Sequence, residues 1–381
     1  MRLIQLDLLR CVAVLLVLGR HLTPCPRDTN AVVWAATAVW QRGGWVGVDL
    51  FFVLSGFLVS GLLFREDQAG GPVDVGRFLV RRAFKIYPSF WALLLVTVLV
   101  GAGQTGGIAR RPLLGELLFL QNYLGGLWEH TWSLAVEEHF YLAFAALALA
   151  LSRLPHRRGA TFASIPALFL ATAVACLGLR WYQSSTMPHS LNALLFPTHL
   201  RIDSLMSGVL VSYWWHSRDL SECRLLKRFP GIVVGVGSLM LLPAFIFPLE
   251  RTWWLPVFGL TLFYVGSSAI LIGCLALRAP QWRATEWLAQ IGARSYSIYL
   301  WHLPVQVWGL HWLRSAVGGE LNWFLYAGCY LGGALVIGIL SSRLIEYPLL
   351  RVRDRLFPSR RDQGRSGVEA LRTSEAQMGI V

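Results

Sequence analysis

Charged residues are scarce in this chain. Only 14% of its 381 residues are Asp, Glu, Lys or Arg, roughly half the share found in soluble domains. Hydrophobic residues make up 55%, and the mean hydropathy is +0.52. This composition excludes a disordered protein and a disulfide-rich secreted module, and it does not fit a water-soluble globular domain. It indicates a protein that crosses a membrane several times.

Cysteine is also rare, with six residues in the chain. Cys25 and Cys223 fall on opposite sides of the membrane in the topology described below, so we do not expect them to pair. The other four lie in apolar stretches, where cysteine acts as a small apolar side chain: Cys11, Cys176, Cys274 and Cys329. The sequence predicts no disulfide framework, no metal site and no array of repeats.

Ten stretches have the length and apolar character of transmembrane helices. Five contain no charged residue: 86–109, 159–179, 229–249, 252–277 and 321–342. Five others carry one to four ionisable residues: 4–21, 45–64, 133–152, 194–215 and 288–310. Residues 112–126 are apolar but too short to span, so we expect an interfacial or re-entrant segment. The sequence therefore predicts an all-α, polytopic membrane bundle of about ten transmembrane helices.

The basic residues of the connections are unequally distributed. When connections are assigned to alternate sides, 23 Lys and Arg residues fall on the side of the N-terminus and 6 on the other. Because basic connections stay in the cytoplasm, both termini are predicted to be cytoplasmic. The asymmetry also accounts for the net charge of +13 without a nucleic-acid partner. We expect residues 1–352 to form the membrane domain and 353–381 a basic, disordered tail, with no appended soluble domain.

Ionisable residues inside these spans are candidates for function, because a charge facing lipid is costly. The first span holds Asp7, Arg10, Arg20 and His21. Arg10 and His21 are 11 residues apart, which places them on one helix face and about 16 Å apart along the axis. A second reading of Arg10 is a structural ion pair with Asp7, one turn away.

Six further motifs accompany this pair. They are GVDLFFVLSGF at 47–57, RRAFKIYP at 81–88, WSLAVEEHFYL at 132–142, Arg201 with Asp203, the Tyr296–His302 string, and Glu346 with Pro348. Together with the Arg10–His21 spacing, they resemble the acyltransferase 3 family of integral membrane acyltransferases, in the family order, from about residue 3 to residue 351. The chain departs from the family pattern at Lys85, His139 and Arg20, where Arg, Gln and an apolar or aromatic residue, respectively, are commoner.

The resemblance implies a bacterial inner-membrane enzyme that moves an acyl group, often acetyl from acetyl-CoA, onto a hydroxyl of a glycan or related acceptor, with no permanently bound cofactor. Near-neutral imidazole suits His21 as the general base, although an acyl-imidazole intermediate stays open. The other candidates fall into three groups: Arg10, Asp49, Glu137 and Glu138 at the reacting centre; Arg81, Arg82 and Lys85 on the coenzyme A phosphates; and Arg201, Asp203, Trp132, Tyr299 and His302 on the acceptor.

Each group also has a structural alternative. The carboxylates and Arg201 can form a buried ion-pair network, the basic cluster at 81–85 can be a cytoplasmic stop signal, and Tyr299 and His302 can be packing residues. Glu137 and Glu138 are about 100° apart on a helix, so only one is expected to face a cavity. A transporter or glycan flippase is the alternative function, because intramembrane ionisable residues also form ion pathways.

Overall fold

The computed structural model describes residues 3–69, 73–105, 107–154, 161–187, 190–217, 220–279, 282–319 and 321–358. Every regular element in these ranges is a helix, which confirms the all-α prediction. The longer helices are α1 (Ile4–His21), α3 (Val46–Gln68), α4 (Val75–Thr105), α7 (Trp132–Arg153), α8 (Ile165–Thr186), α10 (Ile202–Ser217), α12 (Pro230–Ile246), α13 (Leu260–Ala276) and α17 (Trp323–Ser341).

Shorter helical elements connect them. The α-helical ones are α2 (Ala31–Gly43), α5 (Arg110–Leu117), α6 (Gln121–Leu124), α9 (Leu191–Leu195), α11 (Arg224–Arg228), α14 (Arg283–Ala293), α15 (Ser295–Pro304), α16 (Leu310–Val317) and α18 (Tyr347–Leu356). Three single turns, η1 (Glu129–Thr131), η2 (Thr198–Leu200) and η3 (Leu220–Glu222), are 3₁₀ helices. Three more, η4 (Leu255–Gly259), η5 (Val305–Gly309) and η6 (Ser342–Glu346), are π-helical.

Six helical segments among the described residues are long and apolar enough to cross a membrane. They cover 46–68, 75–103, 129–153, 165–186, 255–276 and 323–356, and Pro230–Ile246 is a shorter apolar helix. The count of about ten and the orientation stay predictions. Residues 112–126 fall mostly into the short helices α5 and α6, which agrees with a segment that does not span. The predicted tail lies outside the described residues from 359 onward.

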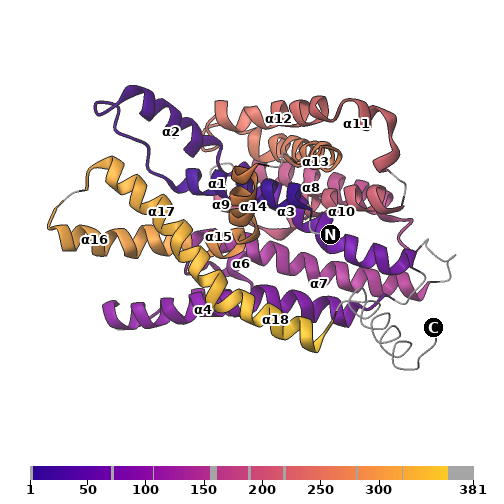
Figure 1. Ribbon diagram of the computed structural model, residues 1–381, viewed down its shortest axis with the longest axis horizontal. Helices are drawn as coiled ribbons and strands as arrows, with labels where there is room; N and C mark the ends of the chain where they lie inside the picture. The colour runs from indigo at the N-terminus through magenta and orange to yellow at the C-terminus, as the bar shows by residue number, and fades with distance from the viewer. Residues whose placement is uncertain are drawn as a thin grey trace, which may run out of the picture.

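The predicted span 288–310 is wrong as a single helix. Arg294 leaves the helical conformation, with φ −105° and ψ 9°, and separates α14 from α15. Gly292 packs so closely on α1 that an added Cβ would lie 1.7 Å from the Asp7 carbonyl oxygen. This contact turns α14 across the bundle instead of along it (Figure 1).

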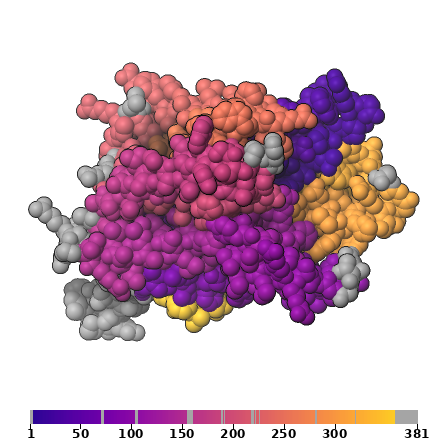
Figure 2. Space-filling model, turned by 180° about the vertical axis from the view of Figure 1, so that it is seen from behind, coloured from indigo at the N-terminus to yellow at the C-terminus, as the bar shows by residue number. Residues whose placement is uncertain are grey.

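Helices α1 and α3 are central, because their buried side chains contribute to both hydrophobic clusters of the core. In Figure 1, α3, α7 and α4 run along the long axis, α12 and α13 cover one side, and α17 crosses the bundle obliquely. Figure 2 shows the opposite face, with α2 in indigo and the orange segment around residues 310–330 projecting at one end.

Two glycines bring α3 and α10 into backbone contact. An added Cβ on Gly56 would lie 2.0 Å from the Leu205 carbonyl oxygen, and one on Gly208 would lie 2.1 Å from that of Val53. Small residues allow this approach between helices in an apolar environment. The contact places the first turns of α3 and α10 side by side, and both turns carry charged residues of the candidate site.

Candidate active site

Three cavities follow one another along α3. We call them the basic cavity, which is lined by Arg65 and other cations, the narrow cavity, which contains Arg10, and the histidine chamber, which contains His21. The basic cavity and the narrow cavity share Arg82 and Lys85, and the narrow cavity shares Val48 and Tyr299 with the histidine chamber. Along α3 they are lined in turn by Arg65, Ser55 and Val48, a distance of about 25 Å at 1.5 Å per residue. The series is therefore nearly as long as a hydrocarbon core is thick, about 30 Å.

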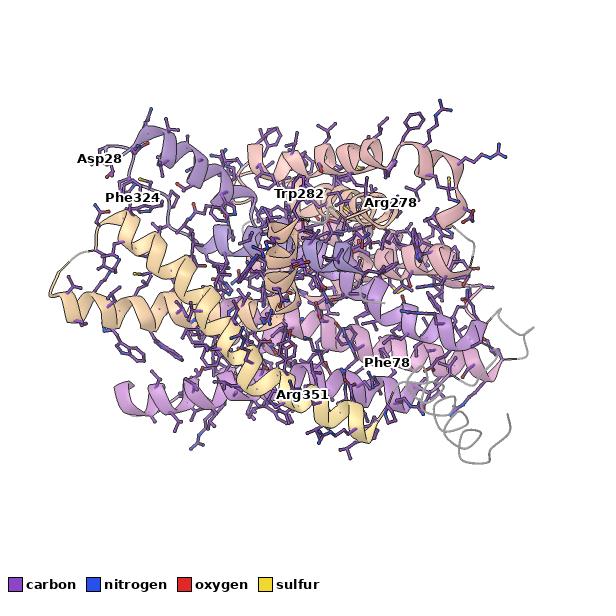
Figure 3. The ribbon with its side chains drawn as sticks, in the orientation of Figure 1. Asp28, Phe78, Arg278, Trp282, Phe324 and Arg351 are labelled. Atoms are coloured by element: carbon purple, nitrogen blue, oxygen red, sulfur yellow. The ribbon has the colours of Figure 1, made fainter. Side chains whose placement is uncertain are left out.

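The basic cavity has the largest volume of the three, about 750 Å³. Among the described residues, six cationic side chains and a single carboxylate, that of Glu66, line it; the cations are Arg65, Arg77, Arg81, Arg82, Lys85 and Arg353. Phe78 also lines it and lies toward the opposite end of the long axis from Asp28 and Phe324 (Figure 3). A strongly cationic cavity of this size suits a ligand with several phosphates.

The residues predicted to bind the donor all line this cavity, and each also has a protein partner. Arg81 forms an ion pair with Asp354 at 3.1 Å, Arg82 donates to the Tyr141 hydroxyl at 2.5 Å, and Lys85 pairs with Glu346. These partners come from α18, α7 and η6, so the cluster joins three elements to α4. Its cations are held in place before any ligand arrives.

The narrow cavity, about 80 Å³, contains Arg10 and Glu137. The Glu137 carboxylate accepts hydrogen bonds from Ser55 Oγ at 3.1 Å and from the Tyr141 hydroxyl at 2.5 Å. Glu138 is buried and accepts a hydrogen bond from the Tyr87 hydroxyl instead. Among the two adjacent carboxylates, the structure therefore places Glu137 at the cavity.

Arg10 also lies close to Asp7, with 3.7 Å between Nη1 and Oδ1. The contact with Asp7 agrees with the structural interpretation of Arg10. The same side chain lines the narrow cavity, and its role at the reacting centre stays a prediction. His21 lies at the other end of α1, in the histidine chamber. The adjacent Arg20 pairs with Glu250 at 2.8 Å. Although burial alone would raise the pKa of Glu250, its bond to Arg20 holds that pKa below the ordinary value.

The histidine chamber, about 110 Å³, holds His21 and His130 beside Trp132, Tyr299 and Arg201. The buried ring of His302 lies between the two imidazoles, with centroids 5.0 Å from that of His21 and 4.9 Å from that of His130.

Backbone hydrogen bonds orient two of these three imidazoles. His302 Nδ1 is 2.5 Å from the Tyr299 carbonyl oxygen, and His130 Nε2 is 3.1 Å from that of Leu300. A carbonyl only accepts, so these nitrogens carry protons. His302 Nε2 and His130 Nδ1 then hold lone pairs in the neutral rings, and neither atom has a hydrogen-bond partner among the described residues.

Two buried ion pairs lie beside the chamber. Arg201 Nη2 is 2.8 Å from Asp49 Oδ1, and Arg180 Nη2 is 2.7 Å from Asp203 Oδ2. The four side chains are at most 2% exposed. The ion-pair interpretation of Asp49, Arg201 and Asp203 therefore has direct support. Arg201 also lines the chamber, with its guanidinium 5.6 Å from the Trp132 ring centroid.

The other predicted acceptor residues, Trp132 and Tyr299, both line the chamber. The Tyr299 hydroxyl donates to the His130 carbonyl oxygen at 2.6 Å and lies 2.6 Å from Ser133 Oγ. Tyr299 also lines the narrow cavity, so its ring forms part of the wall between the two spaces.

Sequence reasoning missed Arg180, His130 and Glu116. Arg180 directly follows a clean apolar stretch, which was a usable signal, and His130 stands two residues before a recognised motif. Glu116 is fully buried and accepts hydrogen bonds from Leu127 N, Trp128 N and Thr131 Oγ1. Burial raises the pKa of Glu116 to about 7. Through these hydrogen bonds, the Glu116 side chain holds the loop that leads to α7.

The described residues contain no group of three or more His, Cys, Asp or Glu side chains arranged to hold a metal ion. The side chains that line these cavities offer imidazole, carboxylate and guanidinium groups. The fold and the site together describe a helical protein whose described residues include six segments apolar enough to cross a membrane and neighbouring cavities lined by ionisable side chains.

Comparison with known proteins identifies the family of this chain. The acyltransferase 3 profile, described as an acyltransferase domain, matches residues 3–343. The chain belongs to this family, which confirms the resemblance seen in its motifs.

Its relatives include O-acetyltransferase OatA of Staphylococcus aureus (strain NCTC 8325 / PS 47), 27% identical over 346 residues, which cover 84% of this chain and 54% of OatA. Another is the protein named "Putative peptidoglycan O-acetyltransferase YrhL" of Bacillus subtilis (strain 168), 28% identical over 385 residues, 93% of this chain and 56% of YrhL. The chain thus spans about half the length of these curated relatives. No solved structure was found to match it.

Proposed function

We propose that this protein is a membrane-bound O-acyltransferase that takes acetyl from acetyl-CoA at the cytoplasmic side and transfers it to a hydroxyl of an envelope glycan at the outer side of a bacterial inner membrane. The observation that carries the proposal is the series of cavities that joins a cationic mouth to a chamber containing His21. The names of OatA and YrhL make an O-acetyl transfer, and a peptidoglycan-type acceptor, the first to test.

The donor fits the cavities by size and charge. The nucleotide and phosphates of coenzyme A suit the basic cavity, whereas the narrow cavity admits only a thin, extended arm. Along α3 that arm would pass from Ser55 to Val48, about 10 Å at 1.5 Å per residue. In the topology that the basic residues favour, the basic cavity lies on the cytoplasmic side. Acyl-CoA is available on that side.

In the proposed step, the acceptor hydroxyl oxygen attacks the thioester carbonyl carbon, and the new C–O bond forms as the C–S bond breaks. The His21 ring takes the hydroxyl proton and returns it to the coenzyme A thiolate, so the products are an ester and a thiol. Arg10 and Glu137, in the narrow cavity, contact the arm that carries the thioester. The carbonyl is expected at the boundary between this cavity and the chamber, near Tyr299.

The transporter alternative is less well supported. A glycan would have to move through the narrow cavity, whose volume of about 80 Å³ is far below the 300–1,000 Å³ of typical ligand sites. Acyl transfer requires only that the thin arm and its acetyl group enter this cavity, which is a much smaller load than a glycan.

The test is transfer of labelled acetyl. Purified protein is reconstituted in liposomes, given labelled acetyl-CoA at the basic face and peptidoglycan fragments at the other, and the glycan is recovered. Ester-linked label on the glycan supports the proposal. Glycan that crosses the bilayer without label would refute it in favour of the transporter, as would an inert protein that is correctly folded.

A further inference from the structure

A fourth cavity adjoins the histidine chamber and has a different composition. This amide cavity has a volume of about 590 Å³, within the usual range for ligand sites. It is lined by residues of α6, η1, α7, α8, α9 and η2. Four of them, Glu129, Trp132, Asn192 and Phe196, also line the histidine chamber. A molecule in the amide cavity therefore extends toward the chamber that holds His21.

Side-chain amides supply most of its polar groups. They belong to Gln121, Asn122, Gln183 and Asn192. No Lys or Arg is among its described lining residues, and its one carboxylate is that of Glu129. Amides both donate and accept hydrogen bonds without charge. Such a lining suits hydroxyl and acetamido groups and gives no compensation to a phosphate or carboxylate.

Three of these amides are oriented by the protein. Gln121 Nε2 donates to the Thr131 carbonyl oxygen at 2.8 Å, Asn122 Nδ2 to Thr198 Oγ1 at 2.8 Å, and Gln183 Nε2 to the Ala193 carbonyl oxygen at 3.0 Å. The carbonyl oxygens of Gln121 and Asn122 are buried and have no partner among the described residues. Because these two oxygens are not exposed to the cavity, the amides available to a ligand are those of Asn192, which is exposed, and Gln183, which is half-buried.

Aromatic rings supply flat apolar surfaces in the same cavity. Trp132 and Phe196 are stacked, with centroids 4.9 Å apart and an interplanar angle of 11°. Tyr123 and His199 form a second parallel pair, with centroids 6.0 Å apart and an angle of 13°. One face of a sugar ring presents C–H groups, which pack on aromatic rings, while its edge presents hydroxyls. Amides beside aromatic faces match both parts of such a ring.

We infer that the amide cavity is a binding subsite for an uncharged saccharide segment of the acceptor, which lies against Trp132 and Phe196 and presents one hydroxyl to the histidine chamber. This inference rests on the proposed function for the meaning of "acceptor", but the binding itself does not require acyl transfer. It assigns Gln183, Asn192 and Tyr123 to ligand contact, which the motifs do not indicate.

The experiment measures binding to the full chain in lipid nanodiscs without any donor, by titration calorimetry. The probes are two uncharged tetrasaccharides, cellotetraose and tetra-N-acetylchitotetraose, and the anionic tetragalacturonate. We expect at least one uncharged probe to bind and the anionic one to bind more weakly. Stronger binding of tetragalacturonate, or no binding of either uncharged probe, would overturn the inference.

Two variants locate the site. Asn192→Ala, at an exposed position, and Gln183→Ala, at a half-buried one, should each weaken saccharide binding about two- to tenfold, the effect of one lost hydrogen bond. Gln290→Ala is the matched control, because Gln290 is an exposed amide on α14 that lines none of these cavities. If Gln183→Ala does not fold, Asn192→Ala decides alone. Equal affinity in Asn192→Ala and the control would refute the assignment.

The two proposals can fail separately. Saccharide binding that the variants weaken, without any label transfer, would leave the subsite standing and refute the acyltransferase function. Label transfer with an unchanged acceptor KM in Asn192→Ala would leave the function standing and refute the subsite.

Discussion

Removing one charge from the buried network beside the histidine chamber should strongly destabilise the folded protein. Removing two opposite charges together should destabilise it much less. Arg180, Asp203, Arg201 and Asp49 are at most 2% exposed, and their formal charges sum to zero. Arg180→Met leaves one uncompensated negative charge in the interior. Breaking one partner of a buried pair costs about 3–5 kcal/mol, which is a large part of the stability of a typical domain.

The double variant Arg180→Met/Asp203→Asn restores neutrality. The amide oxygen introduced by Asp203→Asn would still accept from the Ser204 backbone N–H, which is 3.0 Å from Oδ1 of Asp203. The double variant still lacks the hydrogen bonds from Arg180 to the Leu200 carbonyl oxygen and to Thr261 Oγ1, each of which contributes about 1 kcal/mol. We therefore expect about 2 kcal/mol of destabilisation in the double variant and a coupling energy of about 3 kcal/mol or more between the two sites.

The assay is unfolding of the purified protein in detergent, followed by labelled acetyl transfer for each variant that folds. Single variants that lose stability independently, so that their effects simply add, would refute the network. A double variant that folds and transfers acetyl normally would make Asp203 a structural residue. A double variant that folds but does not transfer would support the prediction that Asp203 contacts the acceptor.

Three further outcomes are expected. His21→Ala should lower the transfer rate by about 10²–10⁴-fold without loss of folding. The control His311→Ala, at an exposed position on α16, should leave the transfer rate unchanged. A normal rate in folded His21→Ala protein would contradict the role of His21 as the base. Arg81→Gln should raise the KM for acetyl-CoA and leave the acceptor KM unchanged, with Arg110→Gln as the control; equal donor KM values would leave only the stop-signal interpretation. Because burial raises the Glu116 pKa from 4.5 to about 7, the folded state retains a proton that the unfolded chain releases, and stability should fall by about 3 kcal/mol as the pH rises across this range. The Glu116→Gln variant keeps the shape of the side chain without its charge, so its unfolding temperature should depend much less on pH than that of the unmodified protein. An unchanged dependence on pH would refute the assignment to Glu116.

The sequence alone was sufficient for properties that depend on composition and on local periodicity. Apolar stretches predicted a helical membrane protein, and the 11-residue spacing placed Arg10 and His21 along one face of α1. The structure puts these two residues in successive cavities of one series. Helical geometry repeats every 3.6 residues whatever surrounds the helix, so such inferences need no knowledge of the other helices. The family motifs are likewise a property of the linear chain.

Partners far apart in the chain could not be predicted in this way. Asp49 and Arg201 are 152 residues apart and meet because Gly56 and Gly208 let α3 and α10 touch. The choice of Glu137 over Glu138 depended on which neighbouring helix lies on each side of α7. The break of the predicted span 288–310 at Arg294 followed from packing of α14 on α1. In each case the free energy comes from a contact between helices, and only the tertiary structure determines which helices are neighbours.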